Sequence, residues 1–92
     1  MSVPRAIEPF YAELGQRIGD ARRRSRLTQE ALGGRLDSSL TRAAIANIES
    51  GKQRVLTKTL VDIAFALDVP AESLLPPRRP VAAAEPAVSL EA

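Results

Sequence analysis

The sequence contains neither cysteine nor histidine. The chain therefore cannot form disulfides, build thiolate or imidazole metal sites, or supply a cysteine nucleophile or a histidine general base. Its acidic residues are scattered and form no obvious catalytic pair. These absences favour a binding protein over an enzyme, with no metal and no cofactor expected. Without cysteine, the sequence carries no sign of the redox compartment.

Long apolar runs are also missing. No stretch approaches the ~20 apolar residues that a membrane-spanning helix needs. The first ten residues, MSVPRAIEPF, lack the basic start and long apolar stretch of a secretory signal. We therefore expect a cytosolic protein with no membrane partner. At 92 residues, the chain is long enough for one domain with one compact core.

The positive charge is concentrated in the middle of the chain. Residues 17–58 carry ten Lys or Arg and four acidic residues, a net charge of +6. Residues 1–16 carry a net charge of −1 and residues 59–92 a net charge of −3. A basic middle is typical of a protein that binds a polyanion such as nucleic acid. An ordinary solvated surface rich in arginine would give the same pattern.

Proline is absent between residues 10 and 69, so helices can run uninterrupted there. We expect helices over residues 9–24, 28–36, 41–50 and 57–68, and a short turn or helix over 71–75. The apolar stripe of the first helix consists of Phe10, Leu14, Ile18 and Ala21. The expected core face of the fourth helix consists of Leu60, Ile63, Ala64 and Leu67. Pro70 is expected to end this helix.

Local signals predict where the two middle helices begin and end. Thr28 and Thr41 are natural N-caps, because a hydroxyl can accept from the free N–H groups of the first turn. Gly51 predicts a C-terminal stop, since glycine accepts the left-handed conformation. Gly33 and Gly34 each cost roughly 1 kcal/mol against alanine in a helix. We interpret this pair as a sign that another helix crosses very close to it.

These elements predict an all-α protein, a compact bundle of four to five helices. The expected organisation is an N-terminal arm over residues 1–8, a domain over 9–75 and a flexible tail over 76–92, which is rich in Pro and Ala. Within the domain, two short helices joined by a tight turn occupy residues 28–51. This is the anatomy of a helix-turn-helix, whose second helix enters the DNA major groove.

The sequence resembles the XRE family, the phage repressor and Cro type of helix-turn-helix protein. The resemblance covers residues 13–75 and rests on three segments in the right order: Leu27–Leu32 (LTQEAL), Ile45 with Ile48–Lys52 (IESGK), and Leu60–Val69 (LVDIAFALDV). It implies a bundle of the phage-repressor type and a double-stranded DNA partner. The chain departs from the family in a longer turn over 36–40 and in the pair Gly33–Gly34.

The resemblance implies a set of DNA-binding residues. Base contacts, with nearby phosphate contacts, are expected from Thr41, Arg42, Ala43 and Asn47. Arg42 would read guanine or else bind a phosphate, and Asn47 would pair with adenine or else remain in solvent. Phosphate contacts are expected from Gln29, Lys52, Gln53 and Arg54, although the last three would otherwise form a solvated loop. Arg17, Arg23 and Arg26 are further candidates for phosphate contacts.

The resemblance also implies one structural ion pair. Glu49 lies on the expected DNA-facing helix, where a negative charge would oppose binding. In this family the glutamate pairs with an arginine of the first helix, which here is Arg22. We therefore interpret Arg22 and Glu49 as a stabilising pair and not as part of the binding site.

The function expected from these features is transcriptional regulation, most simply as a repressor. One such module buries little surface on DNA, so we expect a homodimer on a palindromic operator. Its dimer surface would use residues 71–75 with Val61 and Phe65. The alternative is an antitoxin or other protein-binding module whose tail engages a protein partner.

Overall fold

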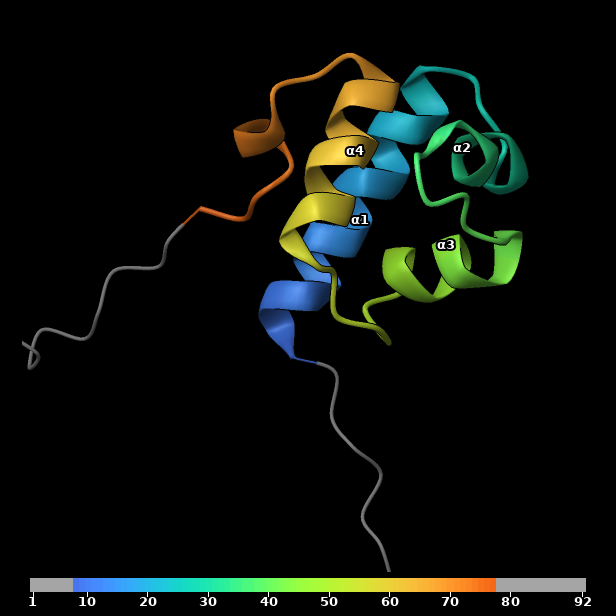
Figure 1. Ribbon diagram of the computed structural model, residues 1–92. Coiled ribbons are helices and arrows are strands. Elements are labelled where there is room, and N and C mark those ends of the chain that lie inside the picture. The colour runs from blue at the N-terminus through green and yellow to red at the C-terminus, as the bar shows by residue number, and fades with distance from the viewer. Residues whose placement is uncertain (1–7, 78–92) are drawn as a thin grey trace, which may run out of the picture.

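The computed structural model describes residues 8–77. It contains four α-helices and one 3-10 helix: α1 (Pro9–Arg24), α2 (Gln29–Arg35), α3 (Arg42–Glu49), α4 (Thr57–Leu67) and η1 (Ala71–Ser73). No strand occurs within this range, which confirms the expected all-α class (Figure 1). The expected arm over 1–8 and tail over 76–92 fall almost entirely outside the described residues. None of the described helices is both long and apolar enough to span a bilayer.

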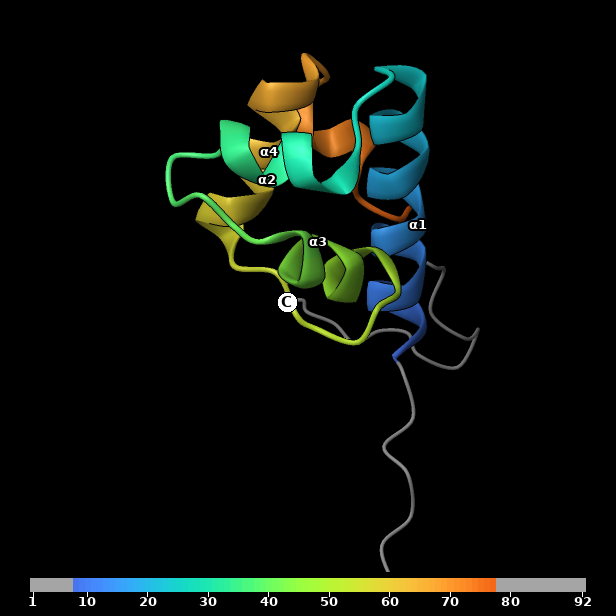
Figure 2. The same ribbon diagram turned by 90° about the vertical axis from the view of Figure 1, so that its right-hand side faces the viewer.

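The helices enclose a single apolar core. α1 packs against α3 and α4, and α2 packs against α3 and α4. The buried side chains come from all four α-helices, from the residue after α2 and from the residue after η1: Leu14, Ile18, Ala21, Leu32, Leu36, Ile45, Ile48, Ile63, Ala64, Leu67 and Leu74. This core holds α2 and α3 together on one side of the bundle, to the right in Figure 1 and toward the viewer in Figure 2.

The apolar stripe of α1 is shorter than the sequence predicts. Leu14, Ile18 and Ala21 are buried as expected, but Phe10 is 45% exposed. Its ring makes an edge-to-face contact with Tyr11, with the ring centroids 5.1 Å apart. Tyr11, and not Phe10, packs against the core cluster. The prediction for Phe10 is therefore wrong, because the aromatic side chain of this turn that reaches the core is that of Tyr11.

The predicted N-caps are confirmed. The Thr28 hydroxyl accepts from the backbone N–H of Ala31 at 3.0 Å, and the Thr41 hydroxyl accepts from that of Ala44 at 3.0 Å. Each bond satisfies a donor that the first helical turn leaves free. These caps fix the starts of α2 and α3, the two helices of the helix-turn-helix.

Left-handed residues end three of the four helices. Gly51 ends α3 with φ 80°, as predicted. The other two ends use non-glycine residues, Arg26 with φ 60° after α1 and Asp68 with φ 59° after α4. The sequence predicts that the fourth helix ends at about residue 68, before Pro70, and α4 ends at Leu67 with Asp68 as its left-handed cap.

The two adjacent glycines of α2 differ in their surroundings. A Cβ on Gly33 would overlap the carbonyl oxygen of Leu40, in the turn before α3. The Leu40 N–H donates to the Gly33 carbonyl at 3.0 Å, so the turn closes directly onto α2. A Cβ on Gly34 would meet nothing within 4 Å. Close approach is therefore correct for Gly33 alone. The overlap would be with the turn, and α3 adds only a side-chain contact from Ile45.

Candidate nucleic-acid interface

Helix α3 presents one face to the core and the opposite face to solvent. Ile45 and Ile48 are 0% and 2% exposed and anchor the inner face, as predicted. Arg42, Ala43 and Asn47 are exposed. Asn47 lies four residues after Ala43, so the two side chains lie on one face of the helix. Figure 2 views the molecule from the side on which α3 and α2 lie.

Gly15 allows α3 to lie close to α1. A Cβ at Gly15 would overlap the backbone carbonyl of Ile48. Because glycine has no side chain, the last turn of α3 packs directly on the backbone of α1. The orientation of α3 is therefore fixed by backbone contact as well as by its two isoleucines.

Three polar side chains connect α1, α2 and α3 behind the exposed face. Arg22 donates from Nε to Glu49 Oε2 at 2.6 Å and from Nη2 to Glu49 Oε1 at 3.0 Å. Gln29 Nε2 donates to the same Glu49 Oε1 at 3.0 Å. The hydrogen bond from Glu49 raises the pKa of Arg22; partial burial acts against this, and the opposite charge of Glu49 adds to it. The expected Arg22–Glu49 pair is therefore present.

Gln29 is thus held within this network. The sequence pointed to it as a phosphate contact, and the structure places it at the first position of α2, half-buried. The bond to Glu49 uses one of the two N–H groups of its amide and leaves the other for a further partner. No sequence signal indicates this bond, because it depends on how α2 and α3 pack.

The segment after α3 is exposed and basic. Lys52, Gln53 and Arg54 are all exposed. Arg54 Nη2 lies 3.6 Å from Glu8 Oε2, and both side chains are largely in solvent, so this pair contributes little. Within residues 8–77, no carboxylate lies within 4 Å of the Lys52 ammonium group. Lys52 is available to a negatively charged partner.

Arg42 borders a shallow hollow between α2 and the start of α3. Its lining residues are Glu30, Gly34, Ser39, Leu40, Thr41 and Arg42. Ser39 has a left-handed backbone with φ 54°. No local sequence signal connects Glu30 or Ser39 with this surface. Only the folding of the turn back onto α2 brings them to it.

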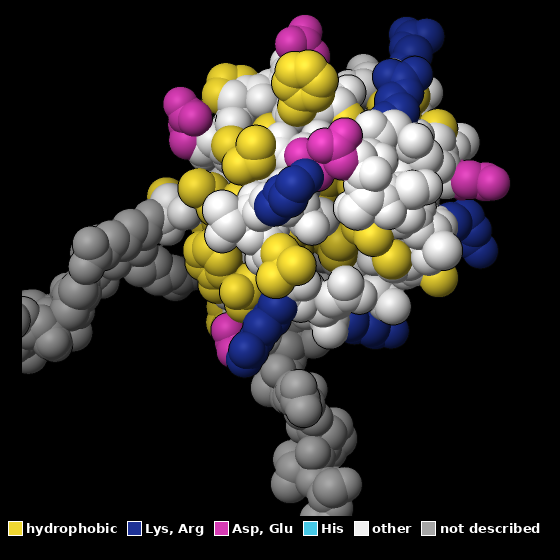
Figure 3. Space-filling view, in the orientation of Figure 1, with side chains coloured by type: hydrophobic (Ala, Val, Ile, Leu, Met, Phe, Trp, Pro, Cys, Tyr) yellow, Lys and Arg dark blue, Asp and Glu magenta, His cyan; other side chains and the backbone are white. Residues whose placement is uncertain are grey.

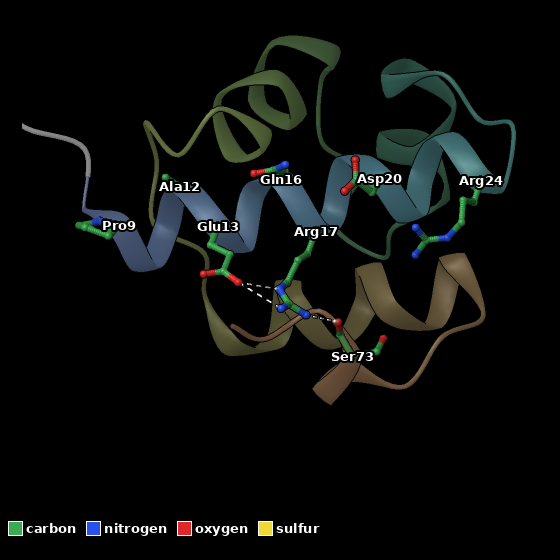
Figure 4. Close-up of a pocket in the computed structure, with 8 residues that line it drawn as sticks. All are labelled: Pro9, Ala12, Glu13, Gln16, Arg17, Asp20, Arg24 and Ser73. Atoms are coloured by element: carbon green, nitrogen blue, oxygen red, sulfur yellow. Dashed lines mark hydrogen bonds and ion pairs between the residues drawn. The ribbon is translucent and has the colours of Figure 1, made fainter. Parts of the chain in front are cut away.

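A second hollow lies on the other side of α1 and does not join this surface. It is lined by Pro9, Ala12, Glu13, Gln16, Arg17, Asp20, Arg24 and Ser73 (Figure 4). Residues 13, 17, 20 and 24 share one stripe of α1, nearly opposite Gly15 and Arg22. Arg17 donates to Glu13 Oε2 at 3.1 and 3.2 Å and to the Ser73 carbonyl at 3.3 Å. The structure therefore separates Arg17 from the other candidates.

Chemically, the exposed face of α3 offers hydrogen-bond donors and a methyl group. Within the described part of the chain, no group of three or more acidic residues could hold a metal ion. What this face provides is a helix with a guanidinium, an amide and small side chains exposed, followed by a basic loop. Such a surface can bind a polyanion and form hydrogen bonds to base edges.

Comparison with known proteins gives one family and several similar structures. Residues 13–75 match the family described as helix-turn-helix domain. No protein of curated function matches the sequence significantly.

Among solved structures, the restriction-modification controller protein C.AhdI from Aeromonas hydrophila is 29% identical, with a TM-score of 0.66, over 71% of this chain and 96% of that one. The P22 c2 repressor, solved with a synthetic operator, is 26% identical, with a TM-score of 0.61, over 67% and 91%. The BldD DNA-binding domain of S. venezulae shares the fold, with a TM-score of 0.68, 20% identity and coverage of 75% and 100%. The chain belongs to the helix-turn-helix domain family, and its fold is that of the DNA-binding domains of phage repressors and controller proteins.

Proposed function

We propose that this protein is a sequence-specific transcriptional regulator that inserts α3 into the major groove of an operator and acts by binding, not by catalysis. One observation carries the proposal. Arg42, Ala43 and Asn47 are exposed on a helix whose opposite face is fixed by Ile45 and Ile48. The similarity to a repressor solved with its operator and to a controller protein supports the same function.

The side chains of α3 have distinct roles in this proposal. The Arg42 guanidinium donates to O6 and N7 of guanine, and the Asn47 amide pairs with N6 and N7 of adenine. Ala43 contacts a thymine methyl group. Thr41 caps α3 through its oxygen, and its hydroxyl proton remains free to donate to DNA.

Phosphate contacts hold α3 in register. Gln29 supplies its remaining amide N–H, with Glu49 orienting the side chain. Lys52, Gln53 and Arg54 reach the backbone beyond the end of α3. These contacts supply affinity for DNA of any sequence, whereas the base contacts supply the preference for the operator sequence.

The proposed assembly is a homodimer on a palindromic operator, where it represses transcription. α4 exposes Val61 and Phe65, which are 51% and 87% exposed and lie four residues apart on one stripe. Figure 3 shows hydrophobic side chains on the face that α4 presents, with basic and acidic ones between them. The Lys58–Asp62 ion pair, at 2.9 Å, borders the stripe.

Selection of DNA fragments tests this function. The wild type and Arg42→Ala are each offered a library of genomic fragments, and the best fragment is titrated at several salt concentrations. The wild type is expected to select a palindromic fragment, with two half-sites one or more helical turns apart and an affinity that falls steeply with salt. Arg42→Ala is expected to lose about 1–3 kcal/mol of discrimination at one base pair of each half-site.

Arg24→Ala is the matched control, because it removes the same charge from the stripe of α1 that faces away from α3. It should select the same fragment as the wild type. If the wild type shows no preference among fragments, and Arg42→Ala binds them equally well, α3 does not read sequence and the proposal fails.

A further inference from the structure

Three helices of this protein end in the same hydrogen-bonded motif. After α3, the Lys52 N–H donates to the Asn47 carbonyl at 3.0 Å and the Gly51 N–H to the Ile48 carbonyl at 3.1 Å. After α1, the Leu27 N–H donates to the Arg22 carbonyl at 3.2 Å and the Arg26 N–H to the Arg23 carbonyl at 3.0 Å. α4 ends in the same way, with Asp68 at the left-handed position. These are Schellman motifs, in which glycine is the favoured left-handed residue.

The residue at the end of α1 is unfavourable for this backbone. Arg26 adopts φ 60°, where a residue with a Cβ is strained and glycine is not. Aspartate is one of the few residues besides glycine that adopt this region routinely, so Asp68 is the less unusual of the two. Arginine has no such compensation. Helix termination alone would therefore be better served by glycine at position 26, so the arginine side chain contributes something other than stability.

The position of Arg26 indicates what its side chain contributes. The next residue, Leu27, is held close to the end of α3, because Arg22 Nη1 donates to the Leu27 carbonyl at 2.8 Å while the same guanidinium binds Glu49. In Figures 1 and 2, the connection between α1 and α2 lies on the same side of the molecule as α2 and α3.

The charge of Arg26 is not neutralised by the rest of the domain. Its side chain is exposed. Within residues 8–77, no carboxylate lies within 4 Å of its guanidinium. Its neighbour Arg23, by contrast, is paired with Asp20 at 2.7 Å. Arg24 lies on the opposite side of α1, in the stripe with Glu13 and Arg17.

We infer that Arg26 is a DNA phosphate-binding residue, placed by the left-handed end of α1 beside the helix-turn-helix and retained there at a cost in stability. The inference rests on the proposed function, since it adds a contact to the same DNA interface. Arg26 contacts the backbone and not a base, so it raises affinity without changing sequence preference. A single phosphate contact adds about 0.9 to the slope of log affinity against log salt concentration.

The variant Arg26→Gly separates the two effects of the side chain. Its melting temperature is expected to rise by about 4–8 °C, since the strain is relieved at a position that prefers glycine. Its DNA affinity is expected to fall, and the salt slope is expected to decrease by about 0.9 on both the selected palindrome and a duplex of unrelated sequence. The preference for the palindrome over the unrelated duplex should remain that of the wild type.

Two further variants provide the controls. Arg26→Lys keeps the charge and should keep most of the salt slope, with the melting temperature of the wild type. Arg24→Gln removes a charge from the opposite side of α1 and should leave the slope unchanged. If Arg26→Gly is more stable but binds both duplexes with the affinity and slope of the wild type, the inference is overturned. If the wild type itself binds neither duplex with a salt-dependent affinity, the proposed function fails first.

Discussion

Arg22 and Glu49 form two hydrogen bonds across 27 residues of sequence, Nε to Oε2 at 2.6 Å and Nη2 to Oε1 at 3.0 Å. Their side chains are only 11% and 9% exposed. The third donor group of Arg22, Nη1, binds the Leu27 carbonyl at 2.8 Å. One guanidinium thus ties the end of α3 to α1 and to the segment that leads into α2. The DNA-facing helix depends on this residue for its position.

Replacing Glu49 with Gln should destabilise the protein substantially. The variant leaves the Arg22 guanidinium largely buried without its counter-charge, which costs about 3 kcal/mol of unfolding free energy. Urea denaturation measures the difference. Asp20→Asn is the control, because it removes the exposed pair with Arg23 and should cost less than about 1 kcal/mol. Equal losses of unfolding free energy in the two variants would show that the Arg22–Glu49 pair stabilises the protein no more than an exposed ion pair does.

The stabilising effect of this pair should persist in alkaline solution. The hydrogen bond to Glu49 raises the pKa of Arg22 in the folded state above its ordinary value. A group whose pKa is raised on folding contributes stability below its unfolded pKa and loses it only as the pH rises through the folded value. The stability difference between the wild type and Glu49→Gln should therefore stay constant from about pH 7 to about pH 10. Urea denaturation across this range measures it, and a steady decline would contradict the assignment.

The two glycines of α2 should respond oppositely to alanine. Gly33→Ala places a Cβ against the Leu40 carbonyl and should cost about 1–3 kcal/mol of unfolding free energy, with weaker DNA binding because the turn before α3 must move. Gly34→Ala places its Cβ in open space and should gain about 0.5–1 kcal/mol, because alanine is the better helix former. Thermal denaturation of both variants measures this. A loss of stability in Gly34→Ala would contradict the geometry of α2.

The sequence predicts the helices well because their signals are local. Threonine hydroxyls at the starts of α2 and α3, and a glycine at the end of α3, act within a few residues of themselves. The left-handed ends at Arg26 and Asp68 carry no such signal, since neither residue type is specific for that backbone. The hydrogen bond between Gln29 and Glu49 depends on the packing of three helices. For the same reason, the different surroundings of Gly33 and Gly34 could not be predicted from two identical residues.

Lys52 and Arg42 should affect DNA binding in different ways. Lys52 is exposed beyond the end of α3, and we expect it to contact phosphate and not bases. Lys52→Ala should weaken binding to all sequences and lower the salt slope by about 0.9. Arg42→Ala should instead reduce the difference between the selected operator and a mutated one. Fluorescence anisotropy with both duplexes at several salt concentrations separates the two effects, and a change of preference in Lys52→Ala would assign it a base contact.

Phe65 should control self-association without contributing to the fold. Its side chain is 87% exposed, so Phe65→Gln should change the unfolding free energy by no more than about 0.5 kcal/mol. In a dimer that buries this side chain at the centre of its interface, the same variant should weaken association about 30-fold. Sedimentation equilibrium of the two proteins measures the difference. Leu56→Gln removes another apolar side chain, 75% exposed at the start of α4 and off the Val61–Phe65 stripe, and should dimerise like the wild type. If Phe65→Gln also associates like the wild type, the dimer forms through another surface, and the exposed stripe of α4 has a different partner.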